Sequence, residues 1–208
     1  VKIVFQEANH GCGKARNGGW EVATQPYVAF LDAEDTWVPQ KVEIQFTWMR
    51  NHPAVLYTGH RVNVVAANNT QPVDITGQPE FTRVHPLRLL LSNQMSAITI
   101  MAKRDMPYRY ATDGRRRTED YLLSCQICLD DIPIYSCSEK LAVLYKPKYG
   151  AGGLSEQLWL MEKSELSVYR DLCRSGRINV IILPFLYIWS LIRHVGRVLI
   201  VAYAQSGR

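Results

Sequence analysis

The amino-acid sequence predicts an α/β protein in which a mostly parallel sheet is flanked by helices. Strand-like and helix-like segments alternate along most of the chain, a pattern typical of βαβ units. The apolar run YVAFL at residues 27–31 does not alternate with polar residues. Such a run favours a strand buried on both faces, as in a parallel sheet covered by helices.

Composition limits the class of protein and of partner. The chain has 208 residues, 47% of them hydrophobic and 21% charged, which is enough for one good core and a small appendage. The net charge of +5 is modest and spread along the sequence, so it favours anionic partners only weakly. There is no RNA-binding aromatic signature and no zinc-finger spacing, and we expect no nucleic-acid partner.

Cysteine usage indicates a reducing compartment. There are five cysteines, an odd number, and the one Cys-x-x-Cys pair, Cys125 and Cys128, lies in an apolar helical run. Without a second pair this spacing cannot close a tetrahedral zinc site. We therefore expect free thiols in the core.

Strands are expected where β-formers cluster. In chain order these segments are residues 2–6, 27–31, 54–67, 97–102, 132–137 and 140–145. The residues Asn68 to Pro72 form a turn signal within this series, and residues 73–84 look irregular.

Helices are expected where apolar residues recur at helical spacing or where a proline or an acidic pair opens a segment. These segments are residues 14–24, 39–51, 86–91, 119–129 and 155–174. Val42, Phe46 and Met49 mark the apolar face of the second. The glycine-rich residues 149–153 lack the Lys-Ser/Thr ending of a P-loop, which favours a flexible connection over a phosphate cradle.

A cluster of carboxylates follows the buried run directly. Asp32, Glu34 and Asp35 lie just past its carboxyl end, the edge at which open α/β sheets bind ligands. Oxygen ligands at this spacing suit a divalent cation such as Mg²⁺ or Mn²⁺. The alternative is that these acids form a turn and cap the helix that Pro39 introduces.

Two charged groups near residue 118 also have two interpretations. Arg115, Arg116 and Arg117 form either a solvated loop or a patch that faces phosphates or a membrane. Glu119 and Asp120 favour the positive end of a helix dipole, so capping alone can explain them.

Several motifs together resemble the family 2 glycosyltransferases. They occur in order as NHGCGKARN at residues 9–17, YVAFLDAEDTWVPQKVEIQ at residues 27–45, Asn93, and RTEDY at residues 117–121. The combination covers about residues 1–146 and is specific, whereas any single motif would be weak. The resemblance implies a GT-A fold and transfer of a sugar from a nucleotide-diphosphate donor with inversion at the anomeric carbon.

The resemblance also assigns roles to individual residues. It places Asp32 and Glu34 at the metal and diphosphate motif, which implies Mg²⁺ or Mn²⁺ as cofactor. It places Arg16, Asn9 and Asp32 at the donor, and Asp120 at the catalytic base, with Glu119 as its neighbour. The family more often has Asp where Glu34 stands, and Asp35 is a second carboxylate within reach of that position.

From this resemblance we expect a cytoplasmic enzyme in cell-surface polysaccharide or glycolipid synthesis, and from the apolar C-terminal segment we expect it to be peripheral at the membrane. Its partners would be a nucleotide-sugar and a saccharide or lipid-linked acceptor. The absence of a Gln-x-x-Arg-Trp motif favours single additions. A non-catalytic GT-A-like scaffold at a membrane is the alternative. Residue 1 matches a strand well inside the domain, so we expect the N-terminal nucleotide-binding part to be missing and an exposed sheet edge to favour homo-oligomers.

The sequence divides into residues 1–150, the glycosyltransferase core, and residues 151–208, a helical extension. Residues 178–192 are almost wholly apolar, and Asn179, Ser190, Arg193, His194 and Arg197 fall in one narrow sector of a helical wheel. This pattern predicts a helix that lies in a membrane interface with its arginines toward lipid headgroups. A core or oligomer-interface helix and a tilted transmembrane helix are the alternatives, and Pro184 is expected to kink any of them.

Overall fold

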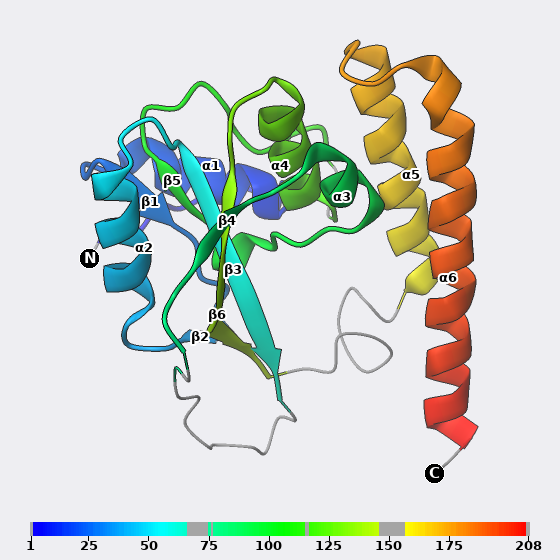
Figure 1. Ribbon diagram of the computed structural model, residues 1–208, viewed down its shortest axis with the longest axis horizontal. Helices are drawn as coiled ribbons and strands as arrows, with labels where there is room; N and C mark the ends of the chain where they lie inside the picture. The colour runs from blue at the N-terminus through cyan, green and yellow to red at the C-terminus, as the bar shows by residue number, and fades with distance from the viewer. Residues whose placement is uncertain (1, 66–74, 76, 115–116, 146–156, 207–208) are drawn as a thin grey trace.

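A six-stranded mixed sheet, covered by helices and flanked by a long helical hairpin, forms the protein (Figure 1). The computed structural model describes residues 2–65, 75, 77–114, 117–145 and 157–206, with side chains as far as residue 203. The strands are β1 Tyr27–Ala29, β2 Thr36–Trp37, β3 Tyr57–Val64, β4 Phe81–Arg83, β5 Met101–Lys103 and β6 Tyr135–Leu144. The helices are α1 Cys12–Val22, α2 Lys41–Asn51, α3 Pro86–Leu91, α4 Glu119–Leu129, α5 Leu158–Arg174 and α6 Leu183–Ser206.

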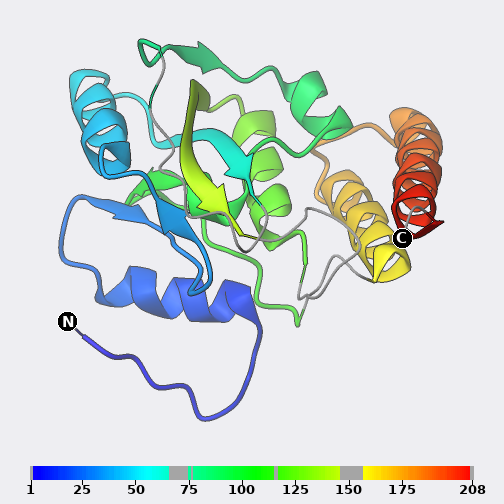
Figure 2. The ribbon, with the colours of Figure 1, turned by 90° about the horizontal axis from the view of Figure 1, so that it is seen from below.

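The α/β class is confirmed, but the sheet is mixed rather than mostly parallel. Its order is β1-β5-β3-β6-β2, and β4 also pairs with β6. Among the described strands only β3 and β6 are parallel, while the other four pairings are antiparallel. Figure 2 shows α2 and the α5–α6 pair at opposite sides of this sheet.

The apolar run at residues 27–31 is predicted to be a strand buried on both faces of a parallel sheet, but the structure places it elsewhere. Its strand, β1, is at the edge of the sheet as described and, among the described strands, pairs with β5 alone. Phe30 packs against Trp20 of α1, with ring centroids 5.3 Å apart, while Leu31 is 46% exposed. An aromatic cluster under α1 therefore accounts for the apolar run, rather than parallel neighbours on both sides.

Other expected strands differ in their bounds. Residues 2–6 are exposed and belong to no described strand, because no neighbouring strand pairs with their backbone. Residues 97–102 begin as the 3₁₀ turn Ala97–Thr99 before β5. The two segments expected at 132–137 and 140–145 form one strand, β6, and β4 lies in a stretch that looks irregular in sequence. The turn at 68–72 and the glycine-rich segment at 149–153 lie outside the described residues.

Helix α2 buries polar residues beside part of the predicted apolar face, since Met49 is buried as expected and Phe46 packs against Tyr27. Lys41, Gln45 and Met49 are buried, whereas Val42 is 48% exposed. The Lys41 ammonium lies 3.7 Å from the centre of the Trp37 ring, and burial lowers the pKa of Lys41 to about 7. The buried face thus combines a cation–π contact and the hydrogen bonds of Gln45 with the apolar contacts of Met49.

Helix α5 packs directly on the core, through α3 and α4. Tyr121 of α4 and Tyr169 of α5 both donate hydrogen bonds to the Leu90 carbonyl, at 2.7 and 2.9 Å. Val168 and Leu172 belong to the same hydrophobic cluster as the residues around Tyr121. The helical extension therefore shares its core with the sheet domain. The Cys125 and Cys128 thiols are buried there and free, as expected.

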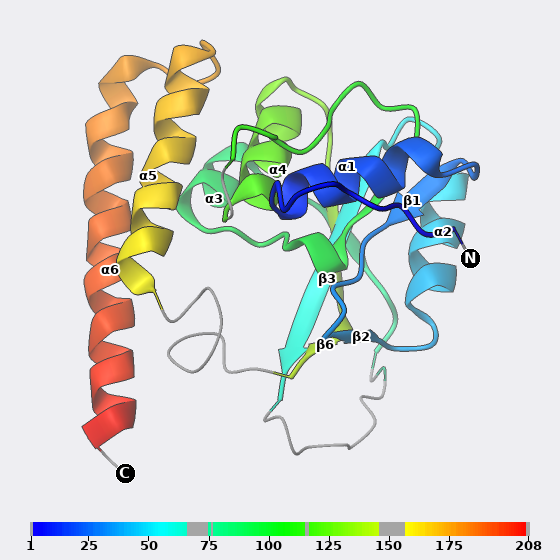
Figure 3. The same ribbon diagram turned by 180° about the vertical axis from the view of Figure 1, so that it is seen from behind.

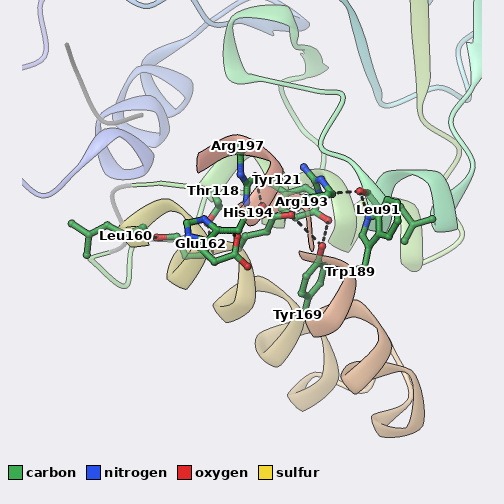
Figure 4. A network of polar contacts seen from close by, with 12 residues as sticks. Leu91, Thr118, Tyr121, Leu160, Glu162, Tyr169, Trp189, Arg193, His194 and Arg197 are labelled. Carbon is green, nitrogen blue, oxygen red and sulfur yellow. Dashed lines mark hydrogen bonds and ion pairs between the residues drawn. The ribbon is translucent and has the colours of Figure 1, made fainter. Parts of the chain in front are cut away.

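The prediction that the basic residues of α6 point toward lipid headgroups is wrong. Arg193, His194 and Arg197 do share one side of the helix, but that side faces α5 (Figure 4). Glu165 accepts from Arg193 at 2.7 Å and from Arg197 at 3.1 Å, and Glu162 accepts from Arg197. Buried charges require such partners. Pro184 causes no kink in the helix interior, because it lies at its second residue.

We predict that Glu162→Ala lowers the free energy of unfolding by about 3–5 kcal/mol, because it leaves the buried Arg197 guanidinium short of a carboxylate. Urea denaturation followed by circular dichroism measures the change. The double variant Glu162→Met with Arg197→Met is the control and should stay within about 1 kcal/mol of the native protein, because it removes both charges. A loss below about 1 kcal/mol in Glu162→Ala would contradict the prediction.

Candidate functional site

A cleft of about 610 Å³ brings together segments that are far apart in the sequence. Its walls come from the first turns of α1, the acidic turn at residues 31–35, the turn at residues 96–98 and the start of α4 at residues 117–120. Figure 3 shows that α1 runs between α4 and β1, so that its first turns lie beside α4. This placement joins the three charged motifs predicted from the sequence.

Arg16 is the link between these motifs. Its guanidinium donates to Asp32 Oδ1 through Nη2 and to Glu119 Oε1 through Nη1, both at 2.8 Å. The side chain of Arg16 is only 12% exposed, and that of Glu119 is 7% exposed. Burial alone would lower the pKa of Arg16, but the attraction and hydrogen bond of Asp32 outweigh it and raise the pKa above its usual value.

Aromatic rings hold Arg16 in place. The guanidinium carbon lies 5.5 Å from the centre of the Tyr110 ring. Tyr110 contacts Phe30 edge-on, with centroids 5.2 Å apart, and Asn17 is hydrogen bonded to the Tyr110 backbone on both its amide atoms. These contacts fix one rotamer of Arg16 and so fix the two carboxylates it bridges. The role of Tyr110 has no signal in the sequence, because it arises only from packing.

Asp120 lies at the cleft wall with both carboxyl oxygens held by backbone. Its Oδ2 accepts from the Ala97 N–H at 3.1 Å and its Oδ1 from the Tyr121 N–H at 2.8 Å. Burial and the neighbouring Glu119 charge raise the pKa of Asp120 to about 6, against the opposing effects of Arg16 and the two N–H groups. A carboxylate with this pKa is ionised at neutral pH and is suited to accept a proton.

The segment before α4 is strained and is supported by α5. Thr118 has φ 61° and ψ 12°, a left-handed conformation that is uncommon for a β-branched residue. Its hydroxyl lies 3.3 Å from the Ser164 carbonyl of α5, and Arg117 donates to Gln157 at 3.0 Å. The sequence did not indicate that the helical extension contacts this part of the site. Arg115 and Arg116 lie outside the described residues.

The acidic turn offers few ligands for a metal ion. Asp32 uses Oδ1 for Arg16, and no hydrogen bond from another described residue reaches its Oδ2. Glu34 is exposed and Asp35 is buried, and both line the same cleft. No group of three His, Cys, Asp or Glu side chains among the described residues is arranged to hold a metal. One or two carboxylates nevertheless fit Mg²⁺ or Mn²⁺ when water and phosphate oxygens supply the remaining ligands.

Asn9 lies outside this cleft. Its Oδ1 accepts from the Gly11 N–H at 3.0 Å, and it lines an adjoining hollow of about 570 Å³. The two hollows share Cys12 and Ala15. The structure therefore brings Asp32, Glu34, Arg16 and Asp120 to one cleft. Asn9 precedes α1 and lines the adjoining hollow instead.

The comparison with known protein families decides the classification. A family model described as Glycosyl transferase family 2 matches residues 1–106. The chain belongs to glycosyl transferase family 2. The match includes Asn9, Arg16, Asp32 and Glu34, whereas the pair Glu119 and Asp120 lies beyond it.

Two curated relatives agree with this assignment. The chain is 26% identical over 175 residues to TuaG, a Bacillus subtilis glycosyltransferase assigned to teichuronic acid biosynthesis, and 26% identical over 175 residues to AmsE, an amylovoran biosynthesis glycosyltransferase of Erwinia amylovora. The alignments cover 84% and 81% of this chain but 67% and 62% of those proteins. The chain thus spans about two thirds of their length.

The crystal structure of S. aureus TarS residues 1–349 in complex with UDP-GlcNAc shares the fold. It superposes with a TM-score of 0.64 at 16% identity, and covers 94% of this chain and 56% of that one. The GT-A fold expected from the sequence motifs is confirmed.

We predict that sugar transfer falls about tenfold per pH unit below pH 6, because protonation of Asp120, whose pKa is about 6, removes its ability to accept a proton. Asp120→Asn should reduce transfer by about 10²–10⁴-fold at pH 7.5. It should also lower the free energy of unfolding by about 1–3 kcal/mol, because the amide nitrogen of Asn cannot accept one of the two backbone N–H bonds. The measurement is kcat/KM against pH with nucleotide-sugar as donor. The control is Glu80→Gln, which changes an exposed acid just before β4 that does not line the cleft. Full activity of Asp120→Asn would refute the role.

Proposed function

We propose that the protein is an inverting glycosyltransferase that moves a single sugar from a nucleotide-diphosphate-sugar to a hydroxyl acceptor in cell-surface polysaccharide or glycolipid synthesis. One observation carries the proposal: a single cleft holds Asp32, the Arg16 bridge and a carboxylate at Asp120 whose raised pKa suits a base. The biosynthetic roles in the names of TuaG and AmsE support the acceptor class.

The chemistry divides between the two sides of the cleft. Asp120 accepts the proton of the acceptor hydroxyl while that oxygen forms a bond to the anomeric carbon. The bond from this carbon to the donor diphosphate breaks, and its electron pair leaves with the diphosphate. Attack from the face opposite the leaving group inverts the configuration. Asp32 and Glu34 would hold Mg²⁺ or Mn²⁺, which supplies charge neutralisation of the diphosphate when bound.

Arg16 has a positioning role in this scheme. It already satisfies one oxygen of Asp32 and one of Glu119, so its charge balances the acidic turn before a donor enters. Asn9 would contact the part of the donor that extends into the adjoining hollow. The cytoplasm is the proposed compartment, since it supplies nucleotide-sugars.

The metal assignment predicts a difference between two variants. Asp32→Ala should abolish the Mn²⁺-dependent part of nucleotide-sugar binding, because it removes the carboxylate oxygen not used by Arg16. Glu34→Asp should retain it, since it keeps a carboxylate at that position. Calorimetry with UDP-GlcNAc and GDP-mannose, with Mn²⁺ or with EDTA, measures the effect. Unchanged binding in EDTA would refute the metal, and metal-dependent binding without any transfer would favour the non-catalytic scaffold.

We propose further that α6 contacts a membrane surface. The stretch Val180–Tyr203 has 24 residues, a mean hydropathy of 1.5 and only 17% of its apolar window buried in the protein. Because its basic side chains are paired with Glu162 and Glu165, no charged side chain of α6 faces outward. The exposed face consists instead of large apolar residues, among them Phe185, Ile188, Ile192, Val195, Leu199 and Ile200. A helix with charge inside and apolar groups outside fits lipid hydrocarbon rather than water.

This geometry predicts salt-insensitive membrane binding. Ile192→Glu with Leu199→Glu should release the protein from liposomes in a flotation assay, because it places two charges on the outward face. The native protein should stay bound to neutral vesicles in high salt. Val42→Glu, at an equally apolar exposed site on α2, is the matched control. Failure of the native protein to float, with dimers detected by light scattering, would assign the face to a second copy.

A further inference from the structure

We propose that a second hollow, on the sheet beside β4, binds a phosphate or diphosphate group. It has a volume of about 240 Å³ and lies between β4, the start of β6 and α3. Three arginines line it, Arg61 of β3, Arg83 of β4 and Arg88 of α3. It is less than half the size of the cleft that holds Asp120, so it suits a small anionic group rather than a whole nucleotide-sugar.

The described lining of this hollow carries positive charge without a carboxylate. No Asp or Glu is among the described residues that line it. Among the described residues, no acidic side chain forms an ion pair with Arg61, Arg83 or Arg88. This contrasts with Arg16, Arg177, Arg193 and Arg197, each of which pairs with a carboxylate. The three arginine side chains are exposed to solvent, and an anion that enters the hollow is attracted by all three positive charges.

Two uncharged polar groups of the hollow, on His85 and Ser138, have a donor hydrogen left for a ligand. His85 Nδ1 accepts from the Leu87 N–H at 3.2 Å, which leaves its Nε2 to carry a proton. Ser138 Oγ accepts from the Glu80 N–H at 3.2 Å, which leaves its hydroxyl hydrogen for another acceptor. With three guanidinium groups, the hollow therefore offers N–H and O–H donors and positive charge. This set matches phosphate oxygens, and it excludes a metal cation.

The hollow and the candidate active site share one loop. Gln94 lines the hollow, whereas Ser96 and Ala97, two and three residues later, line the cleft. The Ala97 N–H also donates to Asp120. An anion at the arginines would thus lie beside the loop that also forms part of the cleft wall. If the proposed transfer is correct, a phosphate or diphosphate attached to the acceptor is one source of this anion, and free phosphate is the other.

The binding test needs no catalytic activity. Calorimetry with inorganic pyrophosphate in EDTA, which removes metal-dependent binding, should show saturable binding to the full chain. Arg83→Gln with Arg88→Gln should raise the Kd at least tenfold. Arg170→Gln with Arg174→Gln removes the same charge from the exposed face of α5 and should change the Kd less than twofold. No binding by the native protein, or equal losses in the two double variants, would overturn the site.

A second arm distinguishes the two sources of the anion. The KM for a diphosphate-linked saccharide acceptor should rise in the Arg83→Gln, Arg88→Gln variant, while the KM for the same saccharide without phosphate should not. An unchanged KM for both acceptors, together with weakened pyrophosphate binding, would assign the site to free phosphate. A native protein that binds pyrophosphate but transfers no sugar would refute the proposed function and leave the anion site intact.

Discussion

The ion pairs of Arg16 are the interaction on which the organisation of the site depends. A single guanidinium joins the turn after β1 to the start of α4, residues 32 and 119, with both contacts at 2.8 Å. Without it, two carboxylates would repel across a partly buried cleft, and Glu119 would be a buried charge without a partner. Arg16 lies over the Tyr110 ring, and Trp20 and Phe30 pack against that ring.

The helical hairpin extends this arrangement instead of standing apart from it. Tyr169 of α5 reaches the Leu90 carbonyl, and Trp189 and Arg193 of α6 both donate to the next carbonyl, that of Leu91. Thr118 and Arg117, which precede α4, contact α5. A surface bound by α6 would therefore connect through packed helices to the segment that holds Asp120.

Charged side chains have two different roles in the molecule, buried between α5 and α6 and exposed beside β4. Between α5 and α6, carboxylates and arginines pair with one another at the helix interface, so the outer face of α6 is apolar. Beside β4, three arginines remain without described acidic partners in a small hollow. Since unpaired charges favour contact with an external ligand and paired charges do not, these regions fit different partners, a lipid surface and a phosphate group.

The sequence by itself determined the α/β class, the positions of most helices and the residues of the charged motifs, because these depend on local periodicity, proline placement and motif order. The segments around Pro86 and Glu119 are helices as predicted. Only the tertiary structure decided strand direction, the aromatic support of Arg16 and the inward turn of Arg193 and Arg197. A helical wheel locates a polar sector, but the carboxylates that face it come from another helix, 28 to 35 residues away. Contacts at that separation have no local signal in the sequence.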